Sequence, residues 1–456
     1  MSDLPSSKLG RALVEWRTIL GADHVVADGP ALAAADRACC GRSGGVAAII
    51  FPADEFEACR CLAAAHRNQL PIHTVSLGHN WGYGSRQPPE PPAVVLSLQR
   101  LNDIGALNEQ NGQVTLQPGV TFGALGAWLR SDKPAWLSPE IGAGPNASVV
   151  GNALAGGFGK GPYGWTARRL TNIKFACSDG RIAWLDRLCT SSGGNAARLP
   201  HGAVALQGSF QLCKAPALRS FAWALLADGA DALAAALELA LQHAADHDGS
   251  EQSELLNGAR LRLQCPGLFP HAGDRTHDAW LLAFNLWAQD ESEMAWRQAR
   301  AQRRLAALPA VMHSMEASVA VADLPPTGHE GLTSAYTLTG RQPPADADPD
   351  RDGCGVRWIS PLLPRASAAA VTALDALGAC AIAHDFAPAL AVRLPDGDPV
   401  GLLGLFWNRL GTRADVASND ARAAACNAAF RAKAEQLGFT LYRQGPATTA
   451  IVPEGL

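Results

Sequence analysis

The chain has 456 residues, of which 48% are hydrophobic and 18% are charged, so it can bury a core large enough for two or three folding units. Its 38 Lys and Arg nearly balance its 42 Asp and Glu, which leaves no basic footprint for a nucleic-acid partner. Its eleven cysteines are an odd count, and the opening MSDLPSSKLG has no basic start followed by an apolar stretch. We therefore expect a cytoplasmic protein with reduced thiols. No run approaches the roughly 18 apolar residues of a membrane span, so we expect no membrane association.

The first 190 residues alternate strand and helix signals. Residues 47–51 (AAIIF) predict a strand, and Asp54 with Glu57 three residues on predicts the start of a helix. Residues 70–77 (LPIHTVSL) predict a second strand, which gives a β-α-β beginning. Two further strand-like runs flank a turn at Asn111-Gly112, and a helix follows them.

Two segments of this region are rich in glycine. SLGHNWGYGS, from Ser76 to Ser85, follows a predicted strand, and the stretch from Ile141 to Gly164 has eight glycines in 24 residues. Glycine permits positive φ and exposes backbone N–H groups, which can hold a diphosphate without a lysine. The alternatives are a β-turn with a surface histidine for the first segment and an irregular linker for the second.

Residues 225 to about 420 predict a second, α+β unit. Residues 229–246 and 291–310 have long helical patterns, and residues 389–396 and 400–408 are strand-like. RQPPADADPDRDG, residues 341–353, is acidic and contains proline, so we expect a surface loop there. A last helix from Ser418 to Leu437 should end at Gly438, before a strand FTLYR.

The motifs for metals and for nucleophilic catalysis are incomplete. HAADH at 243–247 has Ala244 where a metalloprotease needs glutamate, and the calcium-like DPDRDG has Ile359 at its twelfth position. Gly41 to Gly45 spell G-x-S-x-G, but the strand comes after the motif and not before it. Gly159-Lys160 lacks the P-loop spacing. We expect no metal site.

Between residues 46 and 187 the order of motifs resembles the flavoenzyme family of vanillyl-alcohol oxidase and para-cresol methylhydroxylase. The matching pieces are SLGHNWGYGS, VVLSLQRLNDI, VTLQPGVTFGAL, SVVGNALAGGFGKGPYG and the turn at Asp179-Gly180, with weaker matches at WISPL and GFTLYR. The resemblance implies an α+β chain with a two-subdomain FAD-binding domain of the PCMH type and an α+β substrate (cap) domain. It places the FAD domain at residues 1–222 and 418–456, and the cap domain at 223–417.

The resemblance also implies which residues hold FAD. A flavin-linking His or Tyr is missing from GCGVRWISPLLP in the cap domain, so no covalent bond is expected there. His79, however, occupies the position of the flavin-linking histidine of the berberine-bridge and cytokinin-dehydrogenase branches, and an 8α-histidyl link through it is a hypothesis. The implied FAD-binding positions are Gly78, His79, Asn80, Gly82, Gly84, Ser85, Ser148, Val150, Gly151, Asn152, Gly157 and Gly161.

In the phenol-oxidising members, two tyrosines and an arginine surround the phenolate oxygen of the substrate. Tyr83 resembles the first tyrosine, and Tyr442-Arg443 resemble the adjacent Tyr-Arg pair. A phenol has a pKa of about 10, and a guanidinium favours its anion. The resemblance then implies hydride loss from the benzylic carbon to give a quinone methide. Glu140 is the nearest carboxylate candidate for acid or base.

The implied partners are a small aromatic substrate and either molecular oxygen or an electron-transfer protein, with a homodimer as one option. Two alternatives stay open: the same fold oxidising a non-phenolic alcohol or amine, and a scaffold without flavin that serves as a binding or assembly subunit. Residues 188–222 match the family poorly, and the chain ends at PEGL without the D-P-x-x-I-x-x-P-G segment. We therefore expect a rebuilt pocket or weaker FAD binding.

Overall fold

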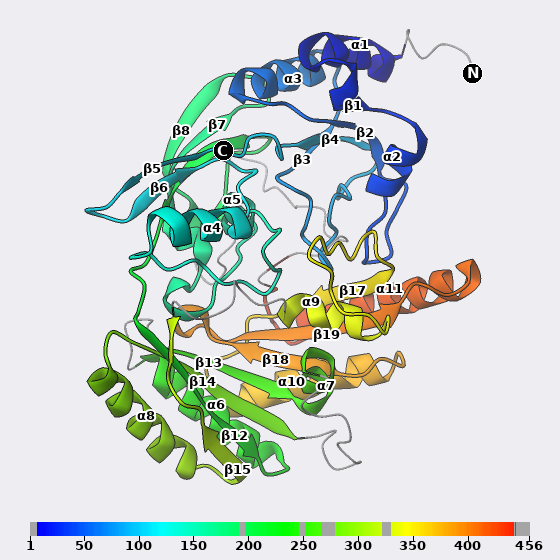
Figure 1. The fold of residues 1–456 in the computed structure, drawn as a ribbon. Helices are drawn as coiled ribbons and strands as arrows, with labels where there is room; N and C mark the ends of the chain where they lie inside the picture. Colours follow the sequence, from blue (N-terminus) through cyan, green and yellow to red (C-terminus); the bar gives the residue numbers. More distant parts are fainter. Residues whose placement is uncertain are drawn as a thin grey trace.

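The computed structural model describes residues 7–190, 197–245, 251–265, 279–321, 330–441 and 443. Two units meet along one interface: an N-terminal unit, blue to green at the top of Figure 1, and a second unit below it. The described part of the chain contains no helix long and apolar enough to cross a membrane. Its described cysteines form no disulfide.

The N-terminal unit begins with a four-stranded sheet in the order β1-β2-β4-β3. Strands β2 and β3 both pair with β4 in parallel, and β1 lies antiparallel at the edge. Asp54 accepts a hydrogen bond from Glu57 N at 2.8 Å and caps helix α3, which confirms the predicted helix start. The elements are α1 (Lys8–Leu20), β1 (Val25–Val26), α2 (Gly29–Ala35), β2 (Val46–Ile50), α3 (Glu55–Arg67), β3 (Ile72–Val75) and β4 (Ala93–Ser97).

A five-stranded antiparallel sheet completes this unit, in the order β5-β6-β11-β7-β8. The hairpin between β5 and β6 turns at Gly112, where φ is 71°, as the Asn111-Gly112 pair predicts. The elements are β5 (Ile104–Asn108), β6 (Gln113–Leu116), α4 (Phe122–Asp132), α5 (Val149–Leu154), β7 (Leu170–Ala176), β8 (Ile182–Arg187), β9 (Cys189–Thr190), β10 (Ala197–Arg198) and β11 (Val204–Gln211).

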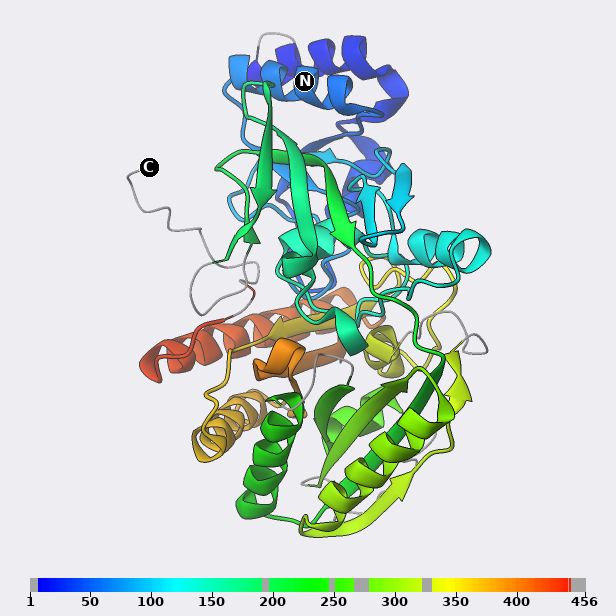
Figure 2. The same ribbon diagram turned by 90° about the vertical axis from the view of Figure 1, so that its left-hand side faces the viewer.

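The second unit is an eight-stranded antiparallel sheet in the order β15-β12-β14-β13-β18-β19-β17, with β16 also paired to β12. Helices α6, α8, α10 and α11 share one hydrophobic core with one face of this sheet (Figure 2). The elements are β12 (Leu218–Leu226), α6 (Ala230–Ala245), β13 (Glu251–Asn257), α7 (Gly258–Gln264), β14 (Trp280–Ala288), α8 (Glu291–Ala306), β15 (Ala310–Met315), β16 (Val319–Ala320), α9 (Glu330–Thr337), β17 (Cys354–Ile359), α10 (Ser367–Ile382), β18 (Ala389–Arg393), β19 (Val400–Asn408) and α11 (Arg413–Gln436).

The opposite face of this sheet, here called the inner face, is turned toward the N-terminal unit. Because side chains alternate along a strand, Leu255 of β13 enters the helix-covered core whereas Gln252 belongs to the inner face. Strand β18 likewise buries Val392 in the helix core and directs Arg393 to the inner face. The inner face therefore presents polar side chains from both β13 and β18 toward the N-terminal unit.

The structure differs from the expected domain boundaries at two points. Strand β12 starts at Leu218, so a boundary at residue 222 falls inside a strand of the second unit. Helix α11 starts at Arg413, capped by Thr412, and buries Phe430 in the helix-covered core of the second unit. The apolar stripe of α11 needs a partner surface, and the eight-stranded sheet supplies it.

The acidic segment 341–353 is not the plain surface loop that its composition predicts. Asp350 is only 5% exposed, and its carboxylate accepts hydrogen bonds from Cys39 N at 2.7 Å and Ser85 Oγ at 2.9 Å. These bonds compensate the burial of a charged group, which a sequence pattern does not reveal. After α11, Leu441 forms an isolated antiparallel bridge with Pro361, and Tyr442 lies outside the described residues.

Candidate active site

Two adjoining cavities lie next to the interface of the units. The larger, of about 350 Å³, is lined by the N-terminal unit and Arg443. The smaller, of about 150 Å³, lies between the N-terminal unit and the inner face of the eight-stranded sheet. Because the two share part of their walls, one elongated molecule can pass from one to the other. The shared residues are His79, Asn80, Ala143, Asn152 and Arg443.

The walls of the larger cavity suit a dinucleotide with a diphosphate. Gly151 packs so closely against the strand-end turn that a Cβ there would lie 2.6 Å from Ser76 Oγ. The described residues that line this cavity include no Asp or Glu, so no carboxylate on the wall would repel a diphosphate. Seven of the predicted FAD-binding positions line it: Gly78, His79, Asn80, Ser85, Ser148, Gly151 and Asn152.

The other five predicted FAD positions are not among the described residues that line either cavity. A Cβ on Gly82 would lie 2.3 Å from Trp358 Cδ1, and one on Gly157 would lie 2.2 Å from Asn152 Oδ1. Gly161 donates its N–H to Gln252 Oε1 at 3.0 Å. Val150 is fully buried in a hydrophobic core, and Gly84 has a φ of 122°. At Gly82 and Gly157 the absence of a side chain permits packing of the protein on itself.

His79 lies where the two cavities meet. Its Nδ1 donates a hydrogen bond to the Asn146 carbonyl at 2.9 Å, and its ring stacks on Trp81 at 4.8 Å between centroids. Burial lowers the pKa of His79 below its ordinary value. The imidazole is therefore neutral near pH 7, with its Nε2 lone pair not needed for the bond to Asn146.

Arg443 connects the end of the described chain to the N-terminal unit. Its guanidinium donates to Ala155 O at 2.9 Å and to Asn80 Oδ1 at 3.1 Å. The same guanidinium lies 5.3 Å from the centroid of the Tyr83 ring, and the Tyr83 hydroxyl is 2.6 Å from Ser360 Oγ. The structure thus brings together Tyr83 and Arg443, two of the three residues predicted for the phenolate site.

Glu140 does not lie on the wall of either cavity. Its carboxylate pairs with Arg219 at 3.2 Å, and its backbone carbonyl accepts a hydrogen bond from Lys160 N at 2.7 Å. The carboxylate is thus engaged with an arginine of the second unit. The acid or base role predicted for Glu140 therefore stays a prediction without support from its position.

Sequence reasoning missed the part of the site that the second unit supplies. Arg260 of α7, Gln252 of β13 and Arg393 of β18 line the smaller cavity, together with Trp358 of β17 and Lys160. Arg393 pairs with its cross-strand neighbour Glu254, and burial lowers the pKa of Arg393 to about 10. Two signals in the sequence point to this wall: an arginine in the apolar run ALAVRLPD and the weak family match at WISPL, which begins with Trp358.

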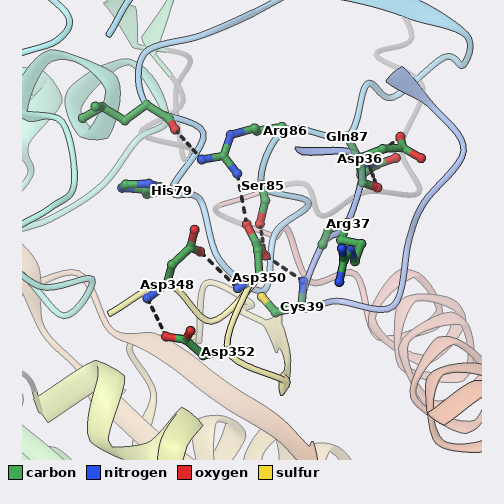
Figure 3. A network of polar contacts seen from close by, with 12 residues as sticks. Asp36, Arg37, Cys39, His79, Ser85, Arg86, Gln87, Asp348, Asp350 and Asp352 are labelled. Atoms are coloured by element: carbon green, nitrogen blue, oxygen red, sulfur yellow. Dashed lines mark hydrogen bonds and ion pairs between the residues drawn. The ribbon is translucent and has the colours of Figure 1, made fainter. Parts of the chain in front are cut away.

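A buried carboxylate supports the turn that carries the site. Figure 3 shows Asp350 between Ser85, Cys39 and Arg86, and the Arg86–Asp350 pair is 3.8 Å long. The Arg86 side chain lies against Gly78 and donates to Leu77 O at 3.3 Å. Burial is the main cause that raises the pKa of Asp350 to about 6. The network therefore ties the second unit to the first glycine-rich turn.

Known proteins resemble this chain in sequence and in fold. A family model for an FAD binding domain matches residues 46–186. The crystal structure of p-cresol methylhydroxylase with substrate bound has a TM-score of 0.76 at 16% identity and covers 96% of this chain and 90% of its own. A 4-ethylphenol oxidase from Gulosibacter chungangensis has a TM-score of 0.75 at 18% identity and covers 96% and 89%. The flavoprotein subunit of a 4-cresol dehydrogenase from Pseudomonas putida is 36% identical over 103 residues, 22% of this chain and 19% of its own.

The fold is that of the PCMH-type flavoproteins, residues 46–186 match an FAD binding domain, and the predicted resemblance is confirmed. The chain is an FAD-dependent enzyme, and its relatives are consistent with an oxidoreductase. Over nearly its whole length it is also similar to a 1'-carboxy-chondrochloren decarboxylase from Chondromyces crocatus, 28% identical over 516 residues, with 98% of this chain and 92% of that protein covered.

Proposed function

We propose that this enzyme oxidises a small para-substituted phenol at its benzylic carbon. The observation that carries the proposal is the Arg443 guanidinium, which lies 5.3 Å from the Tyr83 ring at the junction of the two cavities. A guanidinium stays charged at any working pH and lowers the pKa of a nearby phenol. The two aromatic-substrate proteins with the same fold support this choice of substrate class.

The residues of the smaller cavity divide the work as follows. Arg443 holds the phenolate oxygen, and the Tyr83 hydroxyl, oriented by Ser360 at 2.6 Å, donates to the same oxygen. Trp358 and Leu402 give the cavity apolar walls that exclude water from the benzylic carbon. Bound FAD supplies the two-electron acceptor, and the seven larger-cavity residues named above hold it. Tyr442, next to Arg443, belongs to the same proposal as a second tyrosine.

The experiment compares 4-alkylphenol turnover by the flavin-loaded enzyme and by its Arg443→Gln and Tyr83→Phe variants. We expect Arg443→Gln to lower kcat/KM roughly 100-fold, because a buried charge pair with the substrate is lost. Tyr83→Phe should lower it about tenfold, the value of one hydrogen bond to a charged group. Bound flavin, measured by its visible absorbance, should stay within a factor of two. Unchanged turnover of phenols in Arg443→Gln would contradict the proposal and favour a non-phenolic alcohol or amine.

A purified chain without yellow colour would instead support the flavin-free scaffold.

The covalent link through His79 stays a separate proposal, since the ring lines both cavities. The mass of the acid-washed, denatured chain tests it. Retained flavin that disappears in His79→Ala supports the link, and a mass equal to that of the polypeptide alone rules it out.

A second candidate function is oxidation coupled to loss of a carboxyl group. The described residues that line the smaller cavity include no Asp or Glu that could take a proton from water. Loss of CO₂ needs no such base: once a hydride has left the benzylic carbon, the electron pair of the adjacent C–CO₂⁻ bond forms the side-chain double bond and restores the phenolate. Whole-length similarity to a decarboxylase supports this candidate. Products of 3-(4-hydroxyphenyl)propanoate separate the two outcomes, since hydroxylation adds one oxygen whereas this route releases CO₂ and leaves 4-vinylphenol.

A further inference from the structure

The wall of the smaller cavity is strongly biased toward positive charge. Lys160, Arg260, Arg393 and Arg443 line it, and no Asp or Glu does so among the residues that the structure describes. Glu254 compensates Arg393 from the neighbouring strand, and Lys160 and Arg260 reach the cavity from two other elements. A phenolate carries one negative charge, and in the proposed function Arg443 supplies the positive charge that pairs with it. The cationic side chains on the wall therefore outnumber the single negative charge of a phenolate.

The surroundings of Arg260 restrict its side chain. Its side chain is only 5% exposed, and its guanidinium lies 4.8 Å from the Trp358 ring and 5.4 Å from the Phe406 ring. The two rings lie at 90° to each other, and contact with both restricts the orientation of the guanidinium, whose fork geometry suits a carboxylate. Helix α7, which carries it, is fixed in turn because Asn257 Oδ1 accepts a hydrogen bond from Arg260 N at 2.9 Å.

Two neutral polar atoms of the same wall lack a hydrogen-bond partner among the described residues. Trp81 is 7% exposed and Gln264 is 8% exposed. Trp81 Nε1 and Gln264 Oε1 make no hydrogen bond to any residue that the structure describes. A buried polar atom without a partner costs free energy of folding, so both atoms are better satisfied when a polar ligand occupies the cavity. An indole N–H is a donor only, and the oxygen of an anion would accept its bond.

These cations belong to the substrate end of the site. Lys160 and Arg260 line only the smaller cavity, whereas the diphosphate-compatible turns at Gly78 and Gly151 line only the larger one. Resting on the function proposed above, we propose that the substrate carries a carboxylate as well as its phenol, and that Arg260 and Lys160 bind this carboxylate. A cavity of about 150 Å³ has room for one small molecule, so both groups belong to the same molecule, a 4-hydroxyphenyl alkanoate.

The test measures binding to the flavin-loaded protein by calorimetry, with three probes. They are 3-(4-hydroxyphenyl)propanoate, its neutral amide 3-(4-hydroxyphenyl)propanamide, and 3-phenylpropanoate, which lacks the phenol. We expect the carboxylate probe to bind roughly 30-fold tighter than its amide, the value of charge-assisted hydrogen bonds. Arg260→Gln should reduce this ratio to about threefold and leave the affinity for the amide within about threefold.

Arg262→Gln is the matched control, because Arg262 lies two residues further along α7 and is not among the residues that line the cavity. It should keep the full preference for the carboxylate. If Arg260→Gln does not fold, Lys160→Gln carries the same measurement, since Lys160 is in the same wall but on a loop.

The outcomes separate this proposal from the proposed function. Equal affinity for the acid and its amide overturns the carboxylate subsite and leaves phenol oxidation standing. Equal affinity for 3-(4-hydroxyphenyl)propanoate and 3-phenylpropanoate supports the carboxylate subsite but contradicts the proposed function, because the phenol group then adds nothing to binding. If Arg260→Gln loses flavin absorbance while its remaining flavin-loaded fraction still prefers the acid, then Arg260 serves the cofactor and the proposal fails.

Discussion

The two walls of the site are built in different ways. The N-terminal wall comes mainly from two glycine-rich segments: 76–85, which follows strand β3, and 141–161, which contains helix α5. The wall of the second unit takes single residues, such as Gln252, Arg393 and Trp358, from the inner face of a sheet whose other face is core. A change of one inner-face residue leaves the turns intact, so substrate choice can vary while the cofactor wall is kept.

The largest effect is expected where the two walls touch. A Cβ at Gly82, where φ is +79°, would lie 2.3 Å from Trp358 Cδ1, so Gly82→Ala combines backbone strain with overpacking. We expect a loss of roughly 4 kcal/mol in the free energy of unfolding, measured by urea denaturation. Gly44→Ala is the control, because Gly44 has φ of +84° but nothing within 4 Å of its Cβ position. It should lose only about 1 kcal/mol of unfolding free energy. Equal losses in the two variants would show that Trp358 moves aside at little cost in free energy.

The next effect concerns the ion pair under the second wall. Glu254→Gln leaves Arg393, with 12% side-chain exposure, without its anion, and we expect a loss of roughly 3 kcal/mol in unfolding free energy. The matched surface pair is Arg67–Glu15, with exposures of 60% and 37%, where Glu15→Gln should lose about 0.5 kcal/mol. If chemical denaturation finds the two losses alike, the buried pair does not stabilise the inner face.

A smaller, pH-dependent effect is expected at Asp350, which links the units. Its pKa is raised to about 6, above its value in an unfolded chain, so the folded state binds the extra proton. The stability that this group contributes is present at low pH and is lost as pH rises from about 4 through 6. Asp350→Asn keeps an acceptor for Cys39 N but cannot titrate. Relative to the wild type it should therefore gain about 2 kcal/mol between pH 4 and pH 7.

Thermal unfolding of both proteins at a series of pH values measures this difference. Parallel profiles of melting temperature against pH would refute the raised pKa. Flavin should be released at the pH values and temperatures at which each protein unfolds, because Ser85 and Arg86 support the first glycine-rich turn. Asp350→Ala, which removes the acceptor as well, serves as the disruptive counterpart and should lose stability at every pH.

The smallest effect lies far from both walls. Gly378 is inside helix α10, and the atoms nearest to its Cβ position are 3.8 Å away. Gly378→Ala should raise the free energy of unfolding by about 0.5–1 kcal/mol, because alanine loses less backbone entropy in a helix. Turnover should not change. A destabilised Gly378→Ala would mean that the helix-covered core tolerates less added volume than its spacing indicates.

The sequence determined the cofactor half of the protein. The strand after which Gly78 turns, the cap at Asp54 and the hairpin at Gly112 are local, because capping and positive φ depend on a few adjacent residues. The family resemblance of the two glycine-rich segments implied the positions of Tyr83 and His79 in the site. It likewise implied Asn152 and Ser148, which line the larger cavity.

Only the tertiary structure decided the substrate half. Gln252 reaches the cavity because strand pairing and the alternation of the sheet select which side chains face inward, whereas Arg260 reaches it from helix α7. Neither placement is visible in a local pattern. The acidic, proline-containing stretch around Asp350 predicts a solvent-exposed residue, yet Asp350 is buried and three distant partners offset only part of the cost of its burial. Local rules fix turns and caps, whereas a wall assembled from residues far apart in the chain depends on how the units pack.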